Sequence, residues 1–392
     1  MNTYKITLTP LNRYFFGGDM TFKVEGKKEY NEQYGSYIIR SNRFPQQTSL
    51  LGMLRFLILS NDGQAFDREK NKIADKNRAK ELIGATSFCV NSSNYQENDF
   101  SCIKQLYPCF LELTADGKTI PLLPTPDDYG YQIHLDTAHS VSVNLQFSAL
   151  PIVHGYTPKA TKQQYYLGSS QAIPVDELFI EDSRIGINKD YQGITQTDDA
   201  GLYKQIFYRL GNEKYEGKLH FACYADITDI DLSNYNGSIV NLGGDNSKFL
   251  FKAILVEKAE PITYNSDYND NGKTRQTESD VRYKLVLLSD AYLPLQMGED
   301  RPWSYAISTI VPFRFISTQI EDTENYSILS PKNLRSKKYY LYKKGSVFFC
   351  KDDSEKDKLK EVLESASCFR QIGYNYFQIF KLNLITNTNK AI

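Results

Sequence analysis

Alternation of apolar and polar residues predicts strands along the whole chain. Residues 4–10, YKITLTP, place apolar side chains at every second position, which is the pattern of a half-buried strand. Other short runs are rich in β-branched and aromatic residues, which favour strands. These runs occupy residues 109–113, 220–225, 239–241, 249–252, 283–289, 306–311, 337–349 and 372–380.

Two stretches have the longer period of helices. In residues 50–59 the positions Leu50, Leu51, Leu54, Leu57 and Ile58 form a wide apolar face, and Pro45 with the Thr48 and Ser49 hydroxyls predicts a helix start. Gly52 inside that helix costs roughly 1 kcal/mol relative to alanine, so we expect something to approach it closely. Residues 356–365 form a second helix, with Leu359, Val362 and Leu363 facing inward.

A long hairpin is predicted near the middle of the chain. Residues 184–188 and 202–210 read as strands, and the residues between them are rich in Gly, Thr, Asn and Asp. The tip is polar, and no core residue explains its length. An ordinary mobile surface loop is the alternative interpretation.

Three stretches lack such a pattern. Residues 60–81 are highly charged and predict solvated helices or an insertion. Residues 86–182 have no regular period apart from a few strands, and their Lys159 and Lys162 beside Tyr165 and Tyr166 are a further candidate for partner or RNA contact. Residues 265–278 are hydrophilic and indicate a linker or an exposed loop.

Composition narrows the possible classes of protein. The 392 residues exceed what one hydrophobic core usually organises, so we expect two domains or one domain with large insertions. The 46 Lys and Arg nearly balance 47 Asp and Glu, so a nucleic-acid site must be a local basic groove or use aromatic and backbone contacts. The 29 tyrosines and 22 phenylalanines supply core and strand residues, and some of them could stack on bases.

The cysteines and the apolar segments bear on the compartment. Cys89, Cys102, Cys109, Cys223, Cys350 and Cys368 form no C-x-x-C pair, so we expect buried thiols in a reducing compartment. No apolar segment approaches the length that crosses a bilayer, and the first residues run straight into a strand pattern. We therefore expect a soluble, cytoplasmic protein.

Several motifs together resemble one family. The hairpin carries Arg-Ile-Gly-Ile at residues 184–187, a Thr-rich excursion and Gly-Leu-Tyr at 201–203. The first helix combines Pro45, Thr48, Ser49, Leu50, Gly52, Leu54 and Arg55. Leu-Gly-Gly follows at 242–244, Tyr-x3-Lys-Gly-Ser-Val-Phe-Phe at 340–349 and a late Gly-Tyr at 373–374. This set resembles the RAMP superfamily, the RNA-holding subunits of CRISPR effector complexes, and within it subunit 3 of the type III-B (Cmr) complex.

The resemblance implies an α+β fold of two ferredoxin-like, RRM-like domains. Residues 1–262 would form the first, with an insertion at about 60–182 and a hairpin thumb at about 188–201. Residues 263–392 would form the second.

Candidate RNA-binding residues follow from this comparison together with residue chemistry. Glycines let a backbone approach a ligand closely, helix N-termini attract phosphate, and Arg, Lys and aromatic side chains contact phosphates and bases. For residues 11–19 the alternative is a turn with buried Phe, and for Arg55 it is a solvated charge on a core helix. The candidates are Arg13, Phe16, Gly17, Arg40, Arg43, Ser49, Gly52, Arg55, Arg184, Asn188, Lys189, Thr195, Thr197, Gly201, Tyr203, Gly243, Gly244, Lys248, Gly373 and Tyr374.

No motif for catalysis stands out. RAMP relatives that process guide RNA use a histidine near the first helix, whereas the first histidine here is His134. A palm site needs two carboxylates at a Gly-Gly turn, and Asn246 occupies the second position after Asp245. P-loop, GxSxG and HExxH motifs are missing from the sequence. We expect a non-catalytic protein that needs neither a cofactor nor a metal.

The expected function is that of a guide-RNA scaffold. By resemblance, the chain holds the 5′ handle of the crRNA, sits against the large palm-containing subunit and starts the backbone of RAMP subunits in antiviral defence. The hairpin would wedge into the guide–target duplex and flip one base, so contact with the target RNA is indirect. An endoribonuclease that cuts guide or target RNA, and a purely protein-binding subunit, are the alternatives.

Overall fold

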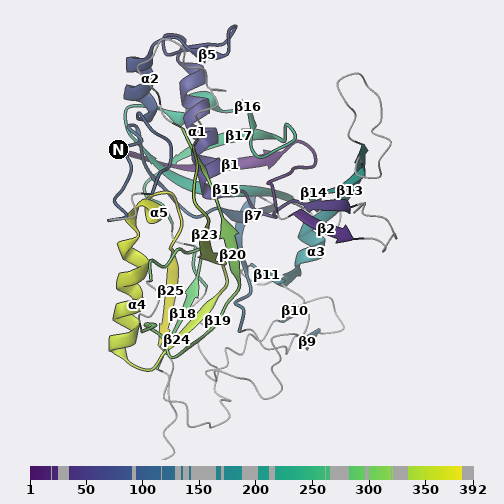
Figure 1. Cartoon of the computed structure of the whole chain (residues 1–392), viewed down its shortest axis with the longest axis vertical. Coiled ribbons are helices and arrows are strands. Elements are labelled where there is room, and N and C mark those ends of the chain that lie inside the picture. Colours follow the sequence, from purple (N-terminus) through teal and green to yellow (C-terminus); the bar gives the residue numbers. More distant parts are fainter. Residues whose placement is uncertain are drawn as a thin grey trace, which may run out of the picture.

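The computed structural model describes residues 1–18, 20–24, 35–90, 94–115, 117–128, 134–135, 141–142, 165–168, 172–187, 202–211, 217–260, 262–264, 282–295, 300–318, 320 and 334–381. Its helices are α1 (Gln47–Asn61), α2 (Lys76–Ile83), α3 (Val175–Leu178), α4 (Asp353–Ser365), α5 (Ser367–Gln371) and the 3-10 turn η2 (Leu232–Tyr235). The fold is strand-rich α+β, as expected (Figure 1).

The strands of the first 260 residues are β1 (Asn2–Pro10), β2 (Met20–Val24), β3 (Gly35–Arg40), β4 (Phe66–Asp67), β5 (Lys72–Ile73), β6 (Ile103–Leu106), β7 (Phe110–Ala115), β8 (Lys118–Pro124), β9 (His134–Leu135), β10 (Val141–Ser142), β11 (Tyr165–Leu167), β12 (Ala172–Pro174), β13 (Phe179–Ile187), β14 (Leu202–Leu210), β15 (Lys218–Ile227), β16 (Ile239–Asn241) and β17 (Lys248–Val256). Those that follow are β18 (Tyr283–Leu287), β19 (Tyr305–Ile307), β20 (Ile310–Phe313), β21 (Ile316–Ser317), β22 (Leu334–Arg335), β23 (Tyr339–Tyr342), β24 (Val347–Cys350) and β25 (Phe377–Lys381).

The largest sheet is organised around the N-terminal strand. β1 lies between β15 and β17, β15 pairs with β7 on its other side, and all these pairings are antiparallel. The alternation read from the sequence holds, because Tyr4, Ile6 and Leu8 are buried. The expected apolar face of α1 packs into the same hydrophobic cluster, and α2 covers α1. Residues 60–81 therefore contribute buried side chains such as Phe66 and Ala79 besides their solvated charges.

The hairpin predicted in the middle of the chain is confirmed in its strands. β13 and β14 pair antiparallel from Phe179↔Leu210 to Ile187↔Leu202. The predicted tip, residues 188–201, lies outside the described residues. β3 adds to β14 in parallel and β2 pairs with β3, an extension that the sequence pattern did not predict.

A second four-stranded sheet lies in the C-terminal part, in the order β19-β24-β18-β25, and α4 packs on it (Figure 1). The predictions of single strands at residues 306–311 and 337–349 were wrong. Each run splits into two strands that join different sheets: β19 and β24 belong to the four-stranded sheet, whereas β20 pairs with β23. The second break is a turn at which Gly345 has φ +92°, a conformation that favours glycine.

Both halves of the chain contribute to one core. The largest hydrophobic cluster contains Tyr4 and Leu54 from the first half together with Phe313, Tyr339 and Phe369 from the second. Phe369 of α5 contacts the rings of residues 88, 292, 313, 339 and 374 at centroid distances of 4.7–6.2 Å. The α5 turn, which was not predicted, therefore joins the two halves.

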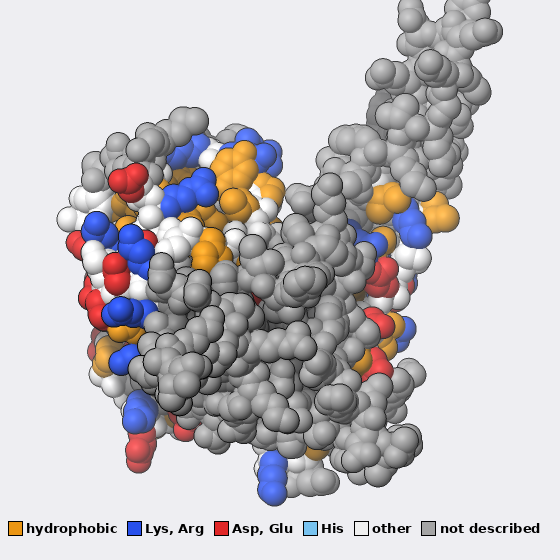
Figure 2. Space-filling view, turned by 90° about the horizontal axis from the view of Figure 1, so that it is seen from below, with side chains coloured by type: hydrophobic (Ala, Val, Ile, Leu, Met, Phe, Trp, Pro, Cys, Tyr) orange, Lys and Arg blue, Asp and Glu red, His pale blue; other side chains and the backbone are white. Residues whose placement is uncertain are grey.

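The surface is of mixed charge. Lysine, arginine and acidic side chains are interspersed on the side where α4 lies (Figure 2), in keeping with a net charge of −1. Five cysteines are buried, as expected, whereas Cys89 is exposed, so the prediction was wrong for that thiol. Among the described residues, no helix is both long enough and apolar enough to span a membrane.

Candidate nucleic-acid interface

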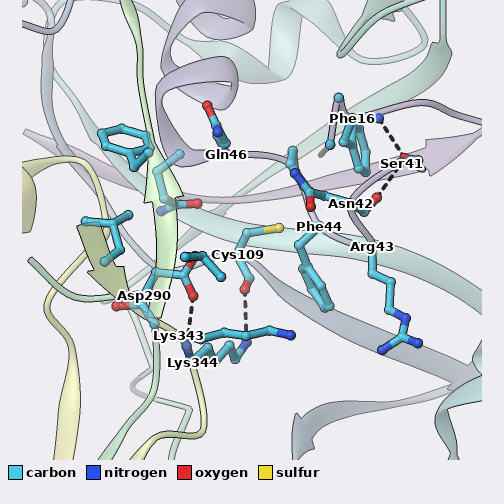
Figure 3. A pocket seen from close by; sticks show the side chains of 18 of the residues that line it. Phe16, Ser41, Asn42, Arg43, Phe44, Gln46, Cys109, Asp290, Lys343 and Lys344 are labelled. Atoms are coloured by element: carbon cyan, nitrogen blue, oxygen red, sulfur yellow. Dashed lines mark hydrogen bonds between the residues drawn. The ribbon is translucent and has the colours of Figure 1, made fainter. Parts of the chain in front are cut away.

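A cleft of about 820 Å³ lies where segments from both halves of the chain meet (Figure 3). The first half lines it with residues 16–18, 40–47, 109, 124–125, 166 and 208. The second half contributes residues 289–290, 311–314, 335, 338, 341, 343–344 and 374. Both halves of the chain are therefore needed to form the cleft.

The charge of the cleft differs from that of the whole chain. Seven basic residues line it, whereas Asp290 is the one acidic residue in the described lining. Such a concentration of positive charge in a neutral protein attracts polyanions locally. The basic residues are Arg40, Arg43, Arg314, Arg335, Lys338, Lys343 and Lys344.

Phe44 stands at the centre of this basic surface, between Arg43 and Lys344 (Figure 3). Its ring lies nearly parallel to that of Tyr166, with centroids 6.2 Å apart, and Lys344 Nζ lies 5.1 Å from its centroid. Lys344 Nζ also donates to the carbonyl of Cys109 at 3.2 Å. The cleft thus combines aromatic faces with cations, the two groups that hold single-stranded nucleic acid.

Burial perturbs the charges of Lys344 and Asp290. Loss of solvation lowers the pKa of Lys344 to about 8, although Cys109 and Asp290 oppose the shift. Burial also raises the pKa of Asp290, while the backbone N–H of Lys344, which donates to Asp290 Oδ1 at 2.8 Å, favours the carboxylate. Lys344 therefore titrates close to physiological pH, and an anion in the cleft would favour its charged form.

Two loops that hydrogen-bond to each other form one wall. The Ser41 hydroxyl accepts from the backbone N–H of Phe16 at 2.8 Å, and the N–H of Asn42 donates to the carbonyl of Gly17 at 2.7 Å. A side chain at Gly18 would collide with the carbonyl of Arg40. Phe16 itself is only 7% exposed and packs near Tyr14 and Phe249, so the alternative of a turn with a buried Phe describes this ring.

The start of α1 opens into the cleft through Gln46 and Gln47, not through the hydroxyls that were expected to cap it. Gln46 is the N-cap residue and makes no side-chain cap hydrogen bond. The N–H of Gln47 donates to the hydroxyl of Tyr374 at 3.3 Å. Gln47 Nε2 donates to the carbonyls of Tyr107 and Ile372 at 3.0 and 2.8 Å. Part of the predicted phosphate-binding helix end is therefore occupied by the second half of the chain.

Gly373 and Tyr374 belong to this junction. Gly373 has φ +95°, and a Cβ there would overlap Gln47 Nε2 and stand 2.8 Å from the backbone of Tyr107. Tyr374 lines the cleft but is only 2% exposed. Both residues hold the start of α1 in place.

The predicted glycine turn at Gly243 and Gly244 lies behind the wall of the cleft. The N–H of Gly244 donates to the carbonyl of Phe15 at 2.7 Å, and Gly243 has φ +93° with no room for a side chain beside that carbonyl. Lys248 is exposed, and its carbonyl accepts from the N–H of Leu11 at 3.0 Å. None of these three residues lines the cleft.

Four predicted site residues lie on or beside the sheet that contains β13 and β14. Arg40 forms an ion pair with Glu181 and reaches the Tyr208 hydroxyl at 3.4 Å. Arg13 Nη1 lies 3.9 Å from Asp182 Oδ2, and its guanidinium lies over the ring of Phe207. Arg184 is exposed, and the ring of Tyr203 covers Gly186. Arg40 lines the cleft, while the others surround the base of the hairpin.

The remaining candidates on α1 have different surroundings. Arg55 is 6% exposed and donates to the carbonyls of Gly84 and Thr86, so the solvated-charge interpretation is wrong and its guanidinium serves the fold. Gly52 is exposed, and no described atom lies within 4 Å of a Cβ built there, so the expected close approach is not found within the described chain. Ser49 is partly buried in the first turn.

Several candidates cannot be placed. Asn188, Lys189, Thr195, Thr197 and Gly201 lie outside the described residues, as do Lys159 and Lys162. Tyr166, the neighbour of that lysine pair in the sequence, does line the cleft. The structure thus brings together Phe16, Gly17, Arg40, Arg43 and Tyr374 from the predicted set.

Most of the basic residues that line the cleft were not among the predicted site residues. Arg314, Arg335, Lys338, Lys343 and Lys344 all come from the second half. The signal was present: residues 301–318 and 334–351 contain eight Lys and Arg and no Asp or Glu. The local charge balance of these two runs therefore differs from that of the whole chain.

Histidine does not line the cleft within the described chain. His220 Nε2 lies 2.9 Å from Glu112 Oε2, a partner that no sequence motif indicated, and both residues are buried on the central sheet. Glu112 also pairs with Lys5. Across the described part of the chain, no group of three or more His, Cys, Asp or Glu is arranged to hold a metal ion.

These features define a strand-rich α+β protein with a basic, aromatic-lined cleft between its halves. The family of the CRISPR-associated protein (Cas_Cmr3) matches residues 6–382, and the chain belongs to that family.

Two chains of solved structures align with most of this chain. One chain from a cryo-EM structure of the type III-B Cmr-beta bound to cognate target RNA is 14% identical, with a TM-score of 0.48 over 95% of this chain and 96% of that one. A chain from the same assembly bound to cognate target RNA and AMPPnP gives 14% identity and a TM-score of 0.46 over the same shares. No curated protein matches the chain.

Proposed function

We propose that this chain is a non-catalytic RNA-binding subunit of a type III-B CRISPR effector complex in antiviral defence. In this proposal it holds the 5′ handle of the crRNA and caps the subunit backbone beside the large palm-containing subunit. Membership of the Cas_Cmr3 family supports the assembly. The cleft, with seven basic residues and one acidic residue in a chain of net charge −1, is the observation that carries the RNA-binding role.

Two groups of four strands are proposed to be ferredoxin-like units, one within the largest sheet and one forming the C-terminal sheet. Numbered along the chain, the strands β1, β7, β15 and β17 lie in the order 4-1-3-2, and β18, β19, β24 and β25 repeat that order. Among the described residues, a helix follows the first strand only in the first unit, as α1, and the helix after the third strand is full length only in the second, as α4. Such units carry RNA on many RNA-binding proteins.

The chemistry of the cleft suits an RNA strand with unstacked bases. Arginine and lysine side chains would neutralise phosphates, and the face of Phe44, flanked by two cations, would accept a base or a ribose. The hairpin that begins on β13 and β14 would project toward the guide–target duplex and displace a base. Arg184 at its base is exposed and suited to a backbone contact.

The proposal is tested by the affinity of the purified chain for single-stranded repeat RNA that carries the 5′ handle. We expect the charge reversals Arg43→Glu and Lys343→Glu together to abolish binding, because each replaces attraction of a phosphate by repulsion. Lys358→Glu with Lys360→Glu on the exposed face of α4 is the matched control and should leave affinity nearly unchanged. Equal loss in both pairs would indicate non-specific charge effects and contradict the proposal.

The absence of catalysis is a separate proposal with its own test. Labelled repeat RNA is incubated with the chain, with and without a divalent metal, and we expect intact RNA in both. A defined cleavage site that disappears in a His220→Ala or Glu112→Gln variant would favour the endoribonuclease alternative.

A further inference from the structure

A two-stranded ribbon, β20 paired with β23, forms one lip of the cleft and has two unlike faces. Its inner face carries Phe313, Tyr339 and Leu341, which are 1–6% exposed. Its outer face carries Pro312 and Tyr340, which are direct cross-strand partners and both exposed. The inner face fixes the ribbon to the core and leaves the outer face to solvent.

Tyr340 is unusual among the aromatic residues of the described chain. Its side chain is 57% exposed, whereas most described rings pack in the core, and Phe56 on α1 is the other large exposed aromatic residue. Lys338 Nζ lies 5.2 Å from the Tyr340 ring centroid. Because tyrosine has only two side-chain torsions, an exposed ring held by a paired strand loses little entropy when a ligand stacks on it.

The described charged side chains along this ribbon are basic. Arg314, Arg335, Lys338 and Lys343 are all exposed, and they continue the basic lining of the cleft along the ribbon. Residues 301–318 and 334–351, which contain the ribbon, carry no acidic residue. A protein partner for such a surface would need a matching acidic face, whereas an RNA strand supplies phosphates and flat bases with regular spacing.

We infer that the outer face of the β20-β23 ribbon is a stacking platform for one unpaired nucleobase of a single-stranded RNA that leaves the cleft. Tyr340 provides the ring on which the base stacks, Pro312 supports the side of that ring, and Lys338 and Arg314 contact the flanking phosphates. Stacking on a ring is tolerant of base identity, so the platform holds position along the strand without reading sequence. This inference rests on the proposed function and extends its RNA path beyond the cleft.

The experiment uses the full chain and a single-stranded oligouridine that contains one 5-iodouridine. Photocrosslinking followed by mass spectrometry locates the contacted residue, and titration measures affinity for the wild-type chain, Tyr340→Ala and Tyr340→Phe. The matched control is Phe56→Ala, which removes an aromatic ring of comparable exposure on α1. Arg43→Glu with Lys343→Glu reports on the cleft independently.

We expect a crosslink to Tyr340 and a loss of affinity in Tyr340→Ala of about fivefold to a hundredfold, the range measured for removal of one base-stacking ring. Tyr340→Phe should bind like the wild type, since it keeps the ring, and Phe56→Ala should be unchanged.

Three results would overturn the inference. If Arg43→Glu with Lys343→Glu abolishes binding while Tyr340→Ala binds like the wild type, RNA does not stack on Tyr340. The proposed function then stands and the inference fails. If Tyr340→Phe is as weak as Tyr340→Ala, the hydroxyl rather than the ring is required, which indicates a hydrogen-bonded protein or ligand contact. Absence of RNA binding by the wild-type chain would defeat the proposed function together with the platform.

Discussion

Four strands of the largest sheet, β1, β7, β15 and β17, have the same order as the C-terminal four-stranded sheet, but the two groups are buried differently. β1 in the largest sheet alternates between buried and half-buried positions, whereas β24 in the C-terminal sheet is buried at every position. The second sheet has a hydrophobic cluster on each face, one of them under α4. The first leaves Leu250 and Ile254 of β17 40% and 46% exposed on its outer face. The same strand order therefore supports an open sheet in one half and an enclosed one in the other.

The halves also divide the cleft between them. The first half supplies Phe44, Tyr166 and the hydrogen-bonded wall of the cleft. Five of the seven basic residues come from the second half. Arg40, one of the two basic residues that the first half contributes to the cleft, already forms an ion pair with Glu181. Neither half alone would form a basic cleft with aromatic faces, so RNA affinity should depend on how the halves are joined.

The largest effect is expected where the two cores meet. Phe369→Ala removes a fully buried ring that contacts aromatic residues from both halves, and such truncations cost about 3–5 kcal/mol of unfolding free energy. Urea denaturation measures the change, and Phe56→Ala, at a ring that is 47% exposed, is the control. Equal destabilisation by the two variants would show that Phe369 does not join the cores.

Gly373→Ala is the next most severe change. The new Cβ would overlap Gln47 Nε2 in a left-handed conformation, and we expect a loss of about 2–4 kcal/mol in unfolding free energy. Gly52→Ala should have the opposite sign, because open space surrounds that exposed helical position and alanine is favoured there by roughly 0.5–1 kcal/mol. Thermal unfolding of the pair distinguishes the two sites, and destabilisation by Gly52→Ala would reveal a contact that the described chain lacks.

The unequal division of charge predicts unequal salt effects. Arg335→Ala with Lys338→Ala should lower the slope of log affinity against log salt by about 0.7 for each phosphate contact that is lost. Arg40→Ala should lower it less, since Glu181 already compensates that charge. Titrations of single-stranded RNA at several salt concentrations measure both, and a larger effect at Arg40 would reverse the assignment of charge to the second half.

The smallest effect concerns pH. The pKa of Lys344 is lowered to about 8, so its charge and one phosphate contact are lost as pH rises from 7 to 9, and RNA affinity should fall by roughly tenfold. Lys344→Arg should bind without this pH dependence, which affinity measurements across the range will test.

Stability should change in the opposite direction. Between pH 8 and pH 10 the folded Lys344 is neutral while the unfolded one is still protonated, so unfolding takes up a proton and the free energy of unfolding rises with pH. A Lys344→Met variant should lack this rise in urea denaturation. A rise that persists in the variant would assign the effect to another group.

The sequence predicted those parts that depend on local pattern. Alternation located β1, apolar periodicity located α1 and α4, and the Gly and Thr-rich stretch located the β13-β14 hairpin. The splitting of residues 306–311 and 337–349 was missed because continuous apolar runs have the same appearance whether one strand or two different sheets use them. The parallel addition of β3 to β14 was missed because it joins distant segments without a local signal.

The site was predicted less completely than the fold. Residues beside glycines and the first helix were found, but Arg55, Gly373 and Tyr374 serve internal contacts that depend on tertiary neighbours. The basic residues that the second half contributes to the cleft come near Arg43 only when the chain has folded. The sequence around these basic residues contains no Asp or Glu, so the local charge balance would have identified them as candidate site residues.

The hydrogen bond between the Tyr374 hydroxyl and the start of α1 has a consequence for biosynthesis. Gln47 leaves the ribosome more than three hundred residues before Tyr374, so the N–H of Gln47 reaches this partner only after residue 374 has been synthesised. A nascent chain stalled short of residue 374 should therefore lack this contact, and we expect the start of α1 to be more accessible to proteases in such a chain.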